Sequence, residues 1–102
     1  MSSKVYWVNS YQQVRDPQKL AAYAQLAGPA IEAAGGRFLA RATAALAYEA
    51  GTLERVVIIE FPSLDAAVAA HDSPAYQAAL AALGDGAVRD LRIVPGLGGK
   101  SG

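Results

Sequence analysis

The chain has no cysteine and a single histidine. Without cysteine it cannot form disulfides, thiolate nucleophiles, or zinc and iron–sulfur sites with cysteine ligands. One histidine and scattered carboxylates are also a poor ligand set for a transition metal. We therefore expect no metal site and no cofactor.

An excess of charge of either sign is missing as well. Nine basic residues balance nine acidic residues, and neither kind forms a block. Because proteins that bind nucleic acid usually carry a basic face, we expect no nucleic-acid partner. No apolar run approaches the ~20 residues that a membrane-spanning helix needs, and residues 1–4 lead into a strand pattern rather than a signal peptide. We expect a cytoplasmic protein without a membrane partner.

The length of 102 residues suits one domain with one core. We expect residues 1–96 to form that domain and residues 97–102, with the sequence LGGKSG, to form a flexible tail.

Four segments carry the β-branched and aromatic residues that are typical of strands. They are Val5–Val14, Arg37–Arg41, Arg55–Phe61 and Val88–Val94. Residues 42–50 are rich in alanine, and we expect either a continuation of the second strand or an irregular arm that closes at Ala50-Gly51.

Regular alternation decides which side chains share a face of each strand. In the second strand it places Phe38 and Ala40 on one face and Arg37, Leu39 and Arg41 on the other.

Helix starts are marked by a capping residue, in two cases followed by proline. Asp16-Pro17 predicts a helix from Pro17 to about Ala34, which Gly35-Gly36 ends. Ser63 predicts a second helix, and Ser73-Pro74 restarts it. The apolar stripe expected on the first half of that second helix is Leu64, Ala67, Val68 and His71.

The resulting order of elements, β-α-β-β-α-β, predicts an α+β fold of the ferredoxin-like kind, with an antiparallel sheet and helices on one face. Val56 to Ile59 are apolar without alternation, which is typical of a strand covered on both faces. Because the helices cover only one face, we expect a second copy to cover the other. The sequence thus predicts a homodimer that encloses a barrel-like space.

Several motifs in this order resemble a known family. They are GGRFLAR (Gly35 to Arg41), RVVIIEFPS (Arg55 to Ser63) and DSPAYQAA (Asp72 to Ala79). Together they are similar to the small bacterial family called domain of unknown function DUF1330. The resemblance covers nearly the whole chain and implies a dimeric α+β barrel with a ferredoxin-like protomer. It implies no settled activity.

Glu60 is the most informative acidic residue, because it follows Val56 and Ile58 on one face of a central strand. An unpartnered carboxylate there would cost several kcal/mol or shift its pKa. Arg41 on the adjacent strand is the expected partner. The pair could be a structural ion pair or a polar anchor for a ligand beneath the sheet.

His71 could act as a general base, since the unperturbed pKa of histidine lies near neutrality. Asp72, adjacent in sequence, is expected to point elsewhere on the helix, so we predict no dyad. Packing or capping explains a lone histidine equally well.

Aromatic residues with hydrogen-bonding tips form a second candidate set, the mixture that small-ligand pockets use. The ligand-binding candidates are Trp7, Asn9, Tyr11, Arg41, Tyr48 and Glu60. Core or dimer packing would explain the same aromatic residues.

Two functions stay open from the sequence. The first is a homodimer that binds a small molecule or has a structural role, without catalysis. The second is a small cofactor-independent enzyme, similar to a monooxygenase or isomerase, with Glu60 and His71 as candidate catalytic residues. The second depends on analogy with the fold alone.

Overall fold

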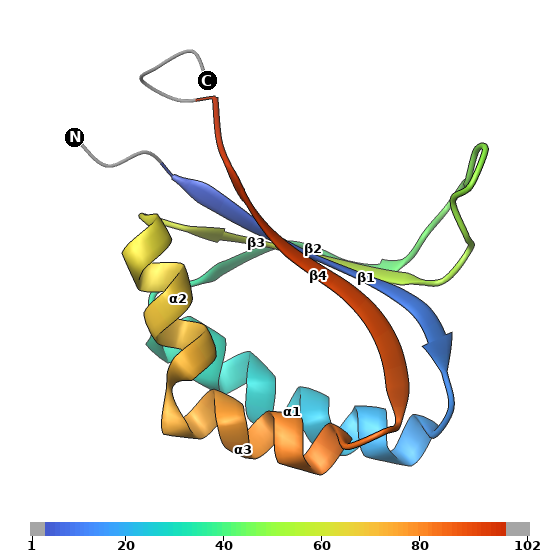
Figure 1. Ribbon diagram of the computed structural model, residues 1–102, viewed down its shortest axis with the longest axis horizontal. Coiled ribbons are helices and arrows are strands. Elements are labelled where there is room, and N and C mark those ends of the chain that lie inside the picture. Colours follow the sequence, from blue (N-terminus) through green and yellow to red (C-terminus); the bar gives the residue numbers. More distant parts are fainter. Residues whose placement is uncertain (1–3, 98–102) are drawn as a thin grey trace.

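The computed structural model describes residues 4–97 as one four-stranded antiparallel sheet with three helices on one face (Figure 1). The strands are β1 (Val5–Val14), β2 (Arg37–Thr43), β3 (Arg55–Phe61) and β4 (Ala87–Pro95), in the spatial order β2-β3-β1-β4. The helices are α1 (Pro17–Ala33), α2 (Leu64–Asp72) and α3 (Pro74–Leu83). The predicted α+β, ferredoxin-like arrangement is confirmed. Of the predicted tail, residues 98–102 lie outside the described residues.

The predicted capping residues begin all three helices. The side chains of Asp16, Ser63 and Ser73 each accept a hydrogen bond from a backbone N–H two or three residues later. At the other end of α1, Gly35 has a φ of 97°, a conformation that glycine adopts without a steric penalty. Local chemistry therefore sets where each helix begins.

The stripe predicted for α2 is partly wrong. Ala67 is buried as expected, but Leu64 is 53% exposed and Val68 is 45% exposed, while Ala70 is buried. The small side chains let the backbone of α2 approach β1, β3 and β4, so the two larger side chains stay at the surface.

The core lies between the sheet and the helices. Trp7, Ile59, Phe61 and Tyr76 are fully buried there. The indole of Trp7 stacks on Phe61 with ring centroids 5.8 Å apart and meets the ring of Tyr76 edge-on at 5.2 Å. The large aromatic side chains thus join β1, β3 and α3 in one packed unit.

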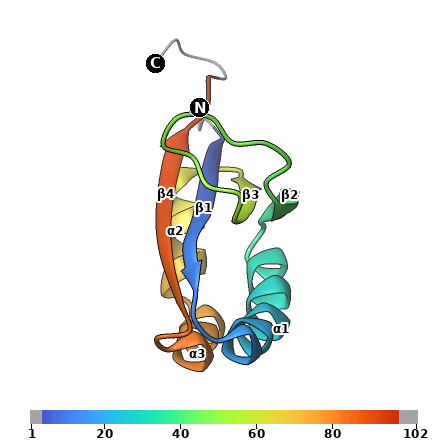
Figure 2. The ribbon, with the colours of Figure 1, turned by 90° about the vertical axis from the view of Figure 1, so that its right-hand side faces the viewer.

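Among residues 4–97, no helix covers the opposite face of the sheet, which we call the outer face (Figures 1 and 2). Val8, Val56 and Ile58 on this face are half-buried, and Leu39 and Val94 are each 45% exposed. In a single chain, therefore, the apolar run of β3 is covered on the helix side only.

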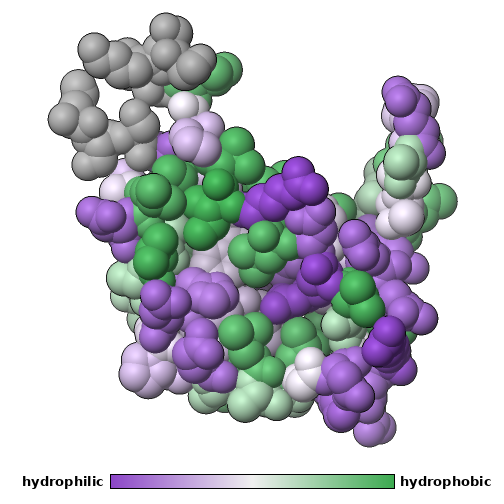
Figure 3. Space-filling model, in the orientation of Figure 1, coloured by the Kyte–Doolittle hydropathy of each residue, from purple (hydrophilic) through white to green (hydrophobic). Residues whose placement is uncertain are grey.

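An irregular arm, residues 44–54, joins β2 to β3. It projects beyond the sheet and stands clear of the rest of the surface (Figures 1 and 3). Its apolar side chains are exposed, with Leu46 at 70%, Tyr48 at 77% and Leu53 at 61%. Of the two readings of residues 42–50, the structure shows two more strand residues followed by this arm. Among the described residues, no helix is long and apolar enough to cross a membrane.

A β-bulge in β2 changes which way its side chains point. Phe38 pairs with Ile59 and Ala40 pairs with Ile58, so Leu39 is an extra residue with no partner on β3. The alternation shifts by one at that point. Arg41 consequently shares the helix-side face with Phe38, contrary to the regular pattern predicted from the sequence.

Candidate functional site

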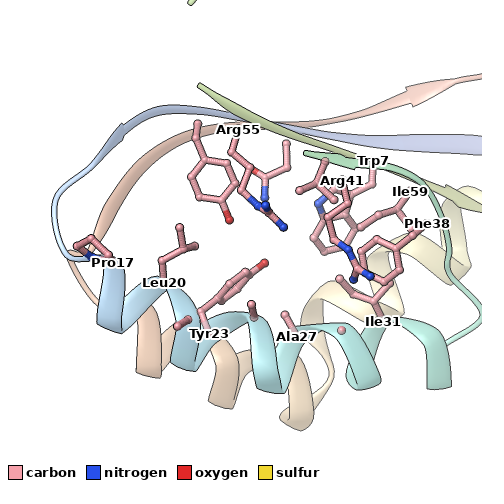
Figure 4. Close-up of a pocket in the computed structure, with 16 residues that line it drawn as sticks. Trp7, Pro17, Leu20, Tyr23, Ala27, Ile31, Phe38, Arg41, Arg55 and Ile59 are labelled. Carbon is pink, nitrogen blue, oxygen red and sulfur yellow. The ribbon is translucent and has the colours of Figure 1, made fainter. Parts of the chain in front are cut away.

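A cavity of about 270 Å³ lies between α1 and the helix-side face of the sheet (Figure 4). This is near the lower end of the ~300–1,000 Å³ typical of ligand pockets. On the sheet side it is lined by Trp7, Asn9, Tyr11, Phe38, Arg41, Arg55, Val57 and Ile59. On the α1 side it is lined by Pro17, Leu20, Ala21, Tyr23, Ala24, Ala27, Gly28 and Ile31.

The composition of α1 explains why space remains there. The lining residues of α1 recur at helical spacing, and four of them, Ala21, Ala24, Ala27 and Gly28, are small. α1 packs along α3 rather than closely on the strands, so short side chains do not fill the distance to the sheet. Ala24 and Arg41 are exposed, which places them at the rim where the cavity opens to solvent.

Two polar atoms on β1 are buried beside the cavity without a hydrogen-bond partner in the described structure. They are Nε1 of Trp7 and Oδ1 of Asn9. Trp7 is 0% exposed and Asn9 is 2% exposed. A buried polar group without a partner costs about 1–3 kcal/mol, so a partner supplied by a ligand would recover that cost.

Two arginines give the cavity a positive charge. Arg41 and Arg55 line it, and no aspartate or glutamate does. Within residues 4–97, neither arginine forms an ion pair. Both side chains reach from the sheet toward α1 (Figure 4), and the guanidinium carbon of Arg41 lies 4.2 Å from the centroid of the Phe38 ring.

The tyrosines of the cavity are hydrogen-bond donors at neutral pH. Burial raises the pKa of Tyr11, and the charge of Arg89, with a smaller contribution from Arg55, opposes that rise. Burial, with a contribution from Tyr76, also raises the pKa of Tyr23. The hydroxyls of Tyr23 and Tyr76 are 2.7 Å apart, and Arg89 lies over the Tyr23 ring at 4.7 Å. Tyr23 is therefore held with its hydroxyl toward the sheet (Figure 4).

Glu60 lies outside the cavity, on the outer face. It accepts a hydrogen bond of 3.1 Å from the hydroxyl of Tyr6 and lies 3.7 Å from Lys4 Nζ and 3.8 Å from Arg37 Nη1. The predicted pairing with Arg41 is wrong, because the bulge at Leu39 turns Arg41 to the other face. Glu60 therefore lies on the opposite side of the sheet from Trp7, Asn9 and Arg41.

His71 does not line the cavity either. Its ring packs against Trp7 and Tyr76, with centroids 5.9 and 5.4 Å away. The prediction that Asp72 points elsewhere is wrong: His71 Nδ1 and Asp72 Oδ1 are 3.0 Å apart. The contact is possible because α2 ends at Asp72. The pair is exposed, so it is a surface contact beside the core.

Tyr48, the last sequence candidate, lies on the arm. It borders a second hollow, of about 630 Å³, between the arm and the outer face, together with Ser10, Gln12 and Val56. It does not line the cavity under α1. Trp7, Asn9, Tyr11 and Arg41 are the candidates that the structure brings together.

Arg55 and Tyr23 line the cavity but are not among the candidates from the sequence. Arg55 is the first residue of β3, the most apolar strand, and lies on the same face as Val57. This position is the sequence signal that could have identified Arg55 as a site residue. Tyr23 reads as an ordinary member of a helix stripe, which gives no hint of a site. Within residues 4–97, no group of three or more His, Asp or Glu residues could hold a metal ion.

Solved structures show that this fold is shared with several small bacterial proteins. A protein of unknown function from Rhodopseudomonas palustris is 23% identical, with a TM-score of 0.70 over 93% of this chain and 82% of that chain. A dimeric ferredoxin-like protein of unknown function from Thermobifida fusca YX is 17% identical, with a TM-score of 0.64 over 93% and 92% of the two chains. SnoaB, a cofactor-independent oxygenase from Streptomyces nogalater, is 16% identical, with a TM-score of 0.59 over 90% and 91%.

No curated protein matches the sequence. The sequence model of one family does, and it matches residues 4–97, the same span that the fold occupies. The resemblance drawn from the strand and helix motifs is thereby confirmed. The chain belongs to the family described as Domain of unknown function (DUF1330).

Proposed function

We propose that this protein is a cytoplasmic homodimer that binds a small, largely apolar molecule in the cavity between α1 and the sheet. The observation that carries the proposal is the pair of buried, unpartnered polar atoms on Trp7 and Asn9 at a cavity walled by apolar side chains. Folded proteins rarely leave such atoms unpaired, and ligand pockets characteristically combine apolar walls with a few polar groups that orient the ligand.

The dimer part of the proposal comes from the outer face. Val8, Val56 and Ile58 are half-buried there with no helix over them, and the arm projects beyond them. Such a face suits a second sheet packed against it. The neighbour from Thermobifida fusca is described as dimeric, which supports a dimer here.

A thermal-shift screen with a matched pair of variants tests the ligand. A molecule present at ~100 times its dissociation constant stabilises the native state by ~2.7 kcal/mol, so it raises the melting temperature. Ala24→Leu places a larger side chain at the mouth of the cavity and obstructs it, whereas Ala22→Leu adds the same side chain to an exposed, non-lining position of α1. We expect hits on the wild type and on Ala22→Leu but not on Ala24→Leu. A broad metabolite screen without any hit, or hits that survive in Ala24→Leu, would refute the site.

A cofactor-independent oxygenase is the second candidate. SnoaB carries that description, and the indole N–H of Trp7 and the amide of Asn9 are groups that could touch a substrate in the cavity. Oxygen consumption with each binding molecule tests this candidate. Glu60→Gln and His71→Ala are expected to leave any turnover unchanged, because both residues lie outside the cavity. A large loss of turnover in either variant would show that the substituted residue takes part in catalysis.

A further inference from the structure

The register of the sheet arranges the polar groups of the cavity in rows. Arg41 pairs with Val57, and Val57 pairs with Asn9, so the three residues form one row across β2, β3 and β1. Neighbouring strands are ~4.8 Å apart, which puts the backbones of Arg41 and Asn9 ~10 Å apart. The row therefore has a cation at one end and a buried amide at the other.

The ends of this row also differ in exposure. Arg41 is exposed at the rim and Asn9 is 2% exposed at the floor. Arg55 joins the cationic end, because it is on β3 two residues before Val57 and faces the same side. Trp7 joins the buried end, two residues before Asn9 on β1. The two cations thus lie on β2 and β3, and the two unpartnered polar atoms lie on β1.

These groups select the chemistry of a ligand. Two arginines without carboxylate partners favour an anionic group, because a guanidinium binds a carboxylate through two parallel N–H bonds. The unpaired Oδ1 of Asn9 needs a donor, such as a hydroxyl. Between Arg41 and Asn9 lies the apolar side chain of Val57, and the Phe38 ring lies beside Arg41, so an apolar, aromatic ligand suits the space.

We infer that the cavity binds a hydroxylated aromatic carboxylate, with its carboxylate at Arg41 and Arg55 and its hydroxyl at Asn9 and Trp7. The inference rests on the proposed function, since it names the class of ligand for the same cavity. The hydroxyl of Tyr11, which also lines the cavity, is a further O–H group for the ligand, whereas the hydroxyl of Tyr23 already pairs with that of Tyr76.

Three related compounds test the two ends separately: para-hydroxycinnamate, its uncharged amide, and cinnamate, which lacks the hydroxyl. Calorimetric titration of the wild type is expected to show para-hydroxycinnamate binding about tenfold or more tightly than either of the others. Arg41→Gln and Arg55→Gln should each lower the affinity for para-hydroxycinnamate about tenfold and leave the affinity for its amide unchanged. Asn9→Leu should remove the preference for the hydroxyl and keep the preference for the acid.

Arg37→Gln is the matched control, because Arg37 is on the same strand as Arg41 but on the outer face beside Glu60. It should bind all three compounds as the wild type does. Arg41→Lys, which keeps the charge, should retain part of the affinity, and circular dichroism reports whether each variant folds. Equal affinity for the acid and the amide would overturn this inference and leave the proposed cavity intact. If none of the three compounds binds, the inference is also overturned. The thermal-shift screen with Ala24→Leu tests separately whether the cavity binds a ligand at all.

Discussion

At the scale of single residues, the cavity is defined by polar side chains in an apolar setting. Asn9 falls in a strand whose helix-side neighbours are Trp7 and Tyr11, all three buried. The sequence predicted that these three could line a site. It could not show that an atom of Asn9 lacks a partner, because that depends on which groups the helices bring opposite.

Asn9→Leu is therefore expected to stabilise the unliganded protein. Leucine has a similar size and removes the unpaired amide, so the free energy of unfolding should rise by about 1 kcal/mol or more. Urea denaturation measures the change, with Ser10→Ala on the outer face as the control for altering β1. A loss of stability in Asn9→Leu would mean that the amide is satisfied in the native state.

Alkaline pH should destabilise the protein through Tyr23. Its pKa is raised in the folded state by burial, while in the unfolded chain a tyrosine titrates near ~10. The folded state then holds its proton more tightly, so this contribution to stability is complete below about pH 10 and is lost as pH rises through the folded pKa.

The free energy of unfolding, measured in urea between about pH 9 and pH 11, should fall less steeply in Tyr23→Phe than in the wild type. Tyr48→Phe, a change on the exposed arm, should follow the wild type. Parallel curves for Tyr23→Phe and the wild type would show that burial does not perturb Tyr23.

At the scale of elements, local capping signals predicted the helix starts correctly, whereas regular alternation predicted the wrong face for one residue of β2. Asp16, Ser63 and Ser73 begin helices where the sequence predicts, because a cap depends only on residues two or three positions away. The face of Arg41 was predicted wrongly, because a bulge depends on the pairing between β2 and β3. The same bulge separates Arg41 from Glu60.

Deletion of Leu39 should preserve both the fold and the position of Arg41. Leu39 has no partner on β3, and its removal leaves Phe38 and Ala40 opposite Ile59 and Ile58 as before. The free energy of unfolding should change by no more than about 1 kcal/mol, because a bulge residue makes no ladder pair.

Deletion of Ile58 is the contrasting control, since Ile58 pairs with Val8 and Ala40 and its loss would turn half of β3 over. Urea denaturation should show that this second deletion is the damaging one. If both deletions unfold the protein, or if the Leu39 deletion alone abolishes the preference for an aromatic acid, the bulge itself is needed.

At the scale of the whole molecule, helices cover one face of the sheet and leave the outer face uncovered. Val57, Ile59 and Phe61 are buried under the helices, whereas Val56 and Ile58 on the same strand are only half-buried. The apolar run of β3 predicted that both faces of the sheet are covered. The helices of one chain cover only one of these faces. We expect a second copy to supply the rest.

Ile58→Asp should convert the proposed dimer to a monomer. A charge at the centre of the outer face would be buried without a partner in the dimer but solvated in the monomer. Sedimentation at micromolar concentration is expected to give twice the 10.5 kDa chain mass for the wild type and the single mass for Ile58→Asp. Val68→Asp, at a 45% exposed position of α2, should remain dimeric. A wild type that sediments as a monomer would refute the dimer.

The sequence by itself determined the order of the elements, the residues at which the helices begin, and the ferredoxin-like arrangement. These follow from capping, glycine conformation and hydrophobic periodicity, which act over a few residues. The tertiary structure alone decided that Arg41 and Arg55 share a cavity with Asn9, and that Glu60 pairs with Tyr6, Lys4 and Arg37. The physical reason is that these contacts join residues on different strands and on α1, so they depend on cross-strand register and on how far a helix of small side chains stands from the sheet.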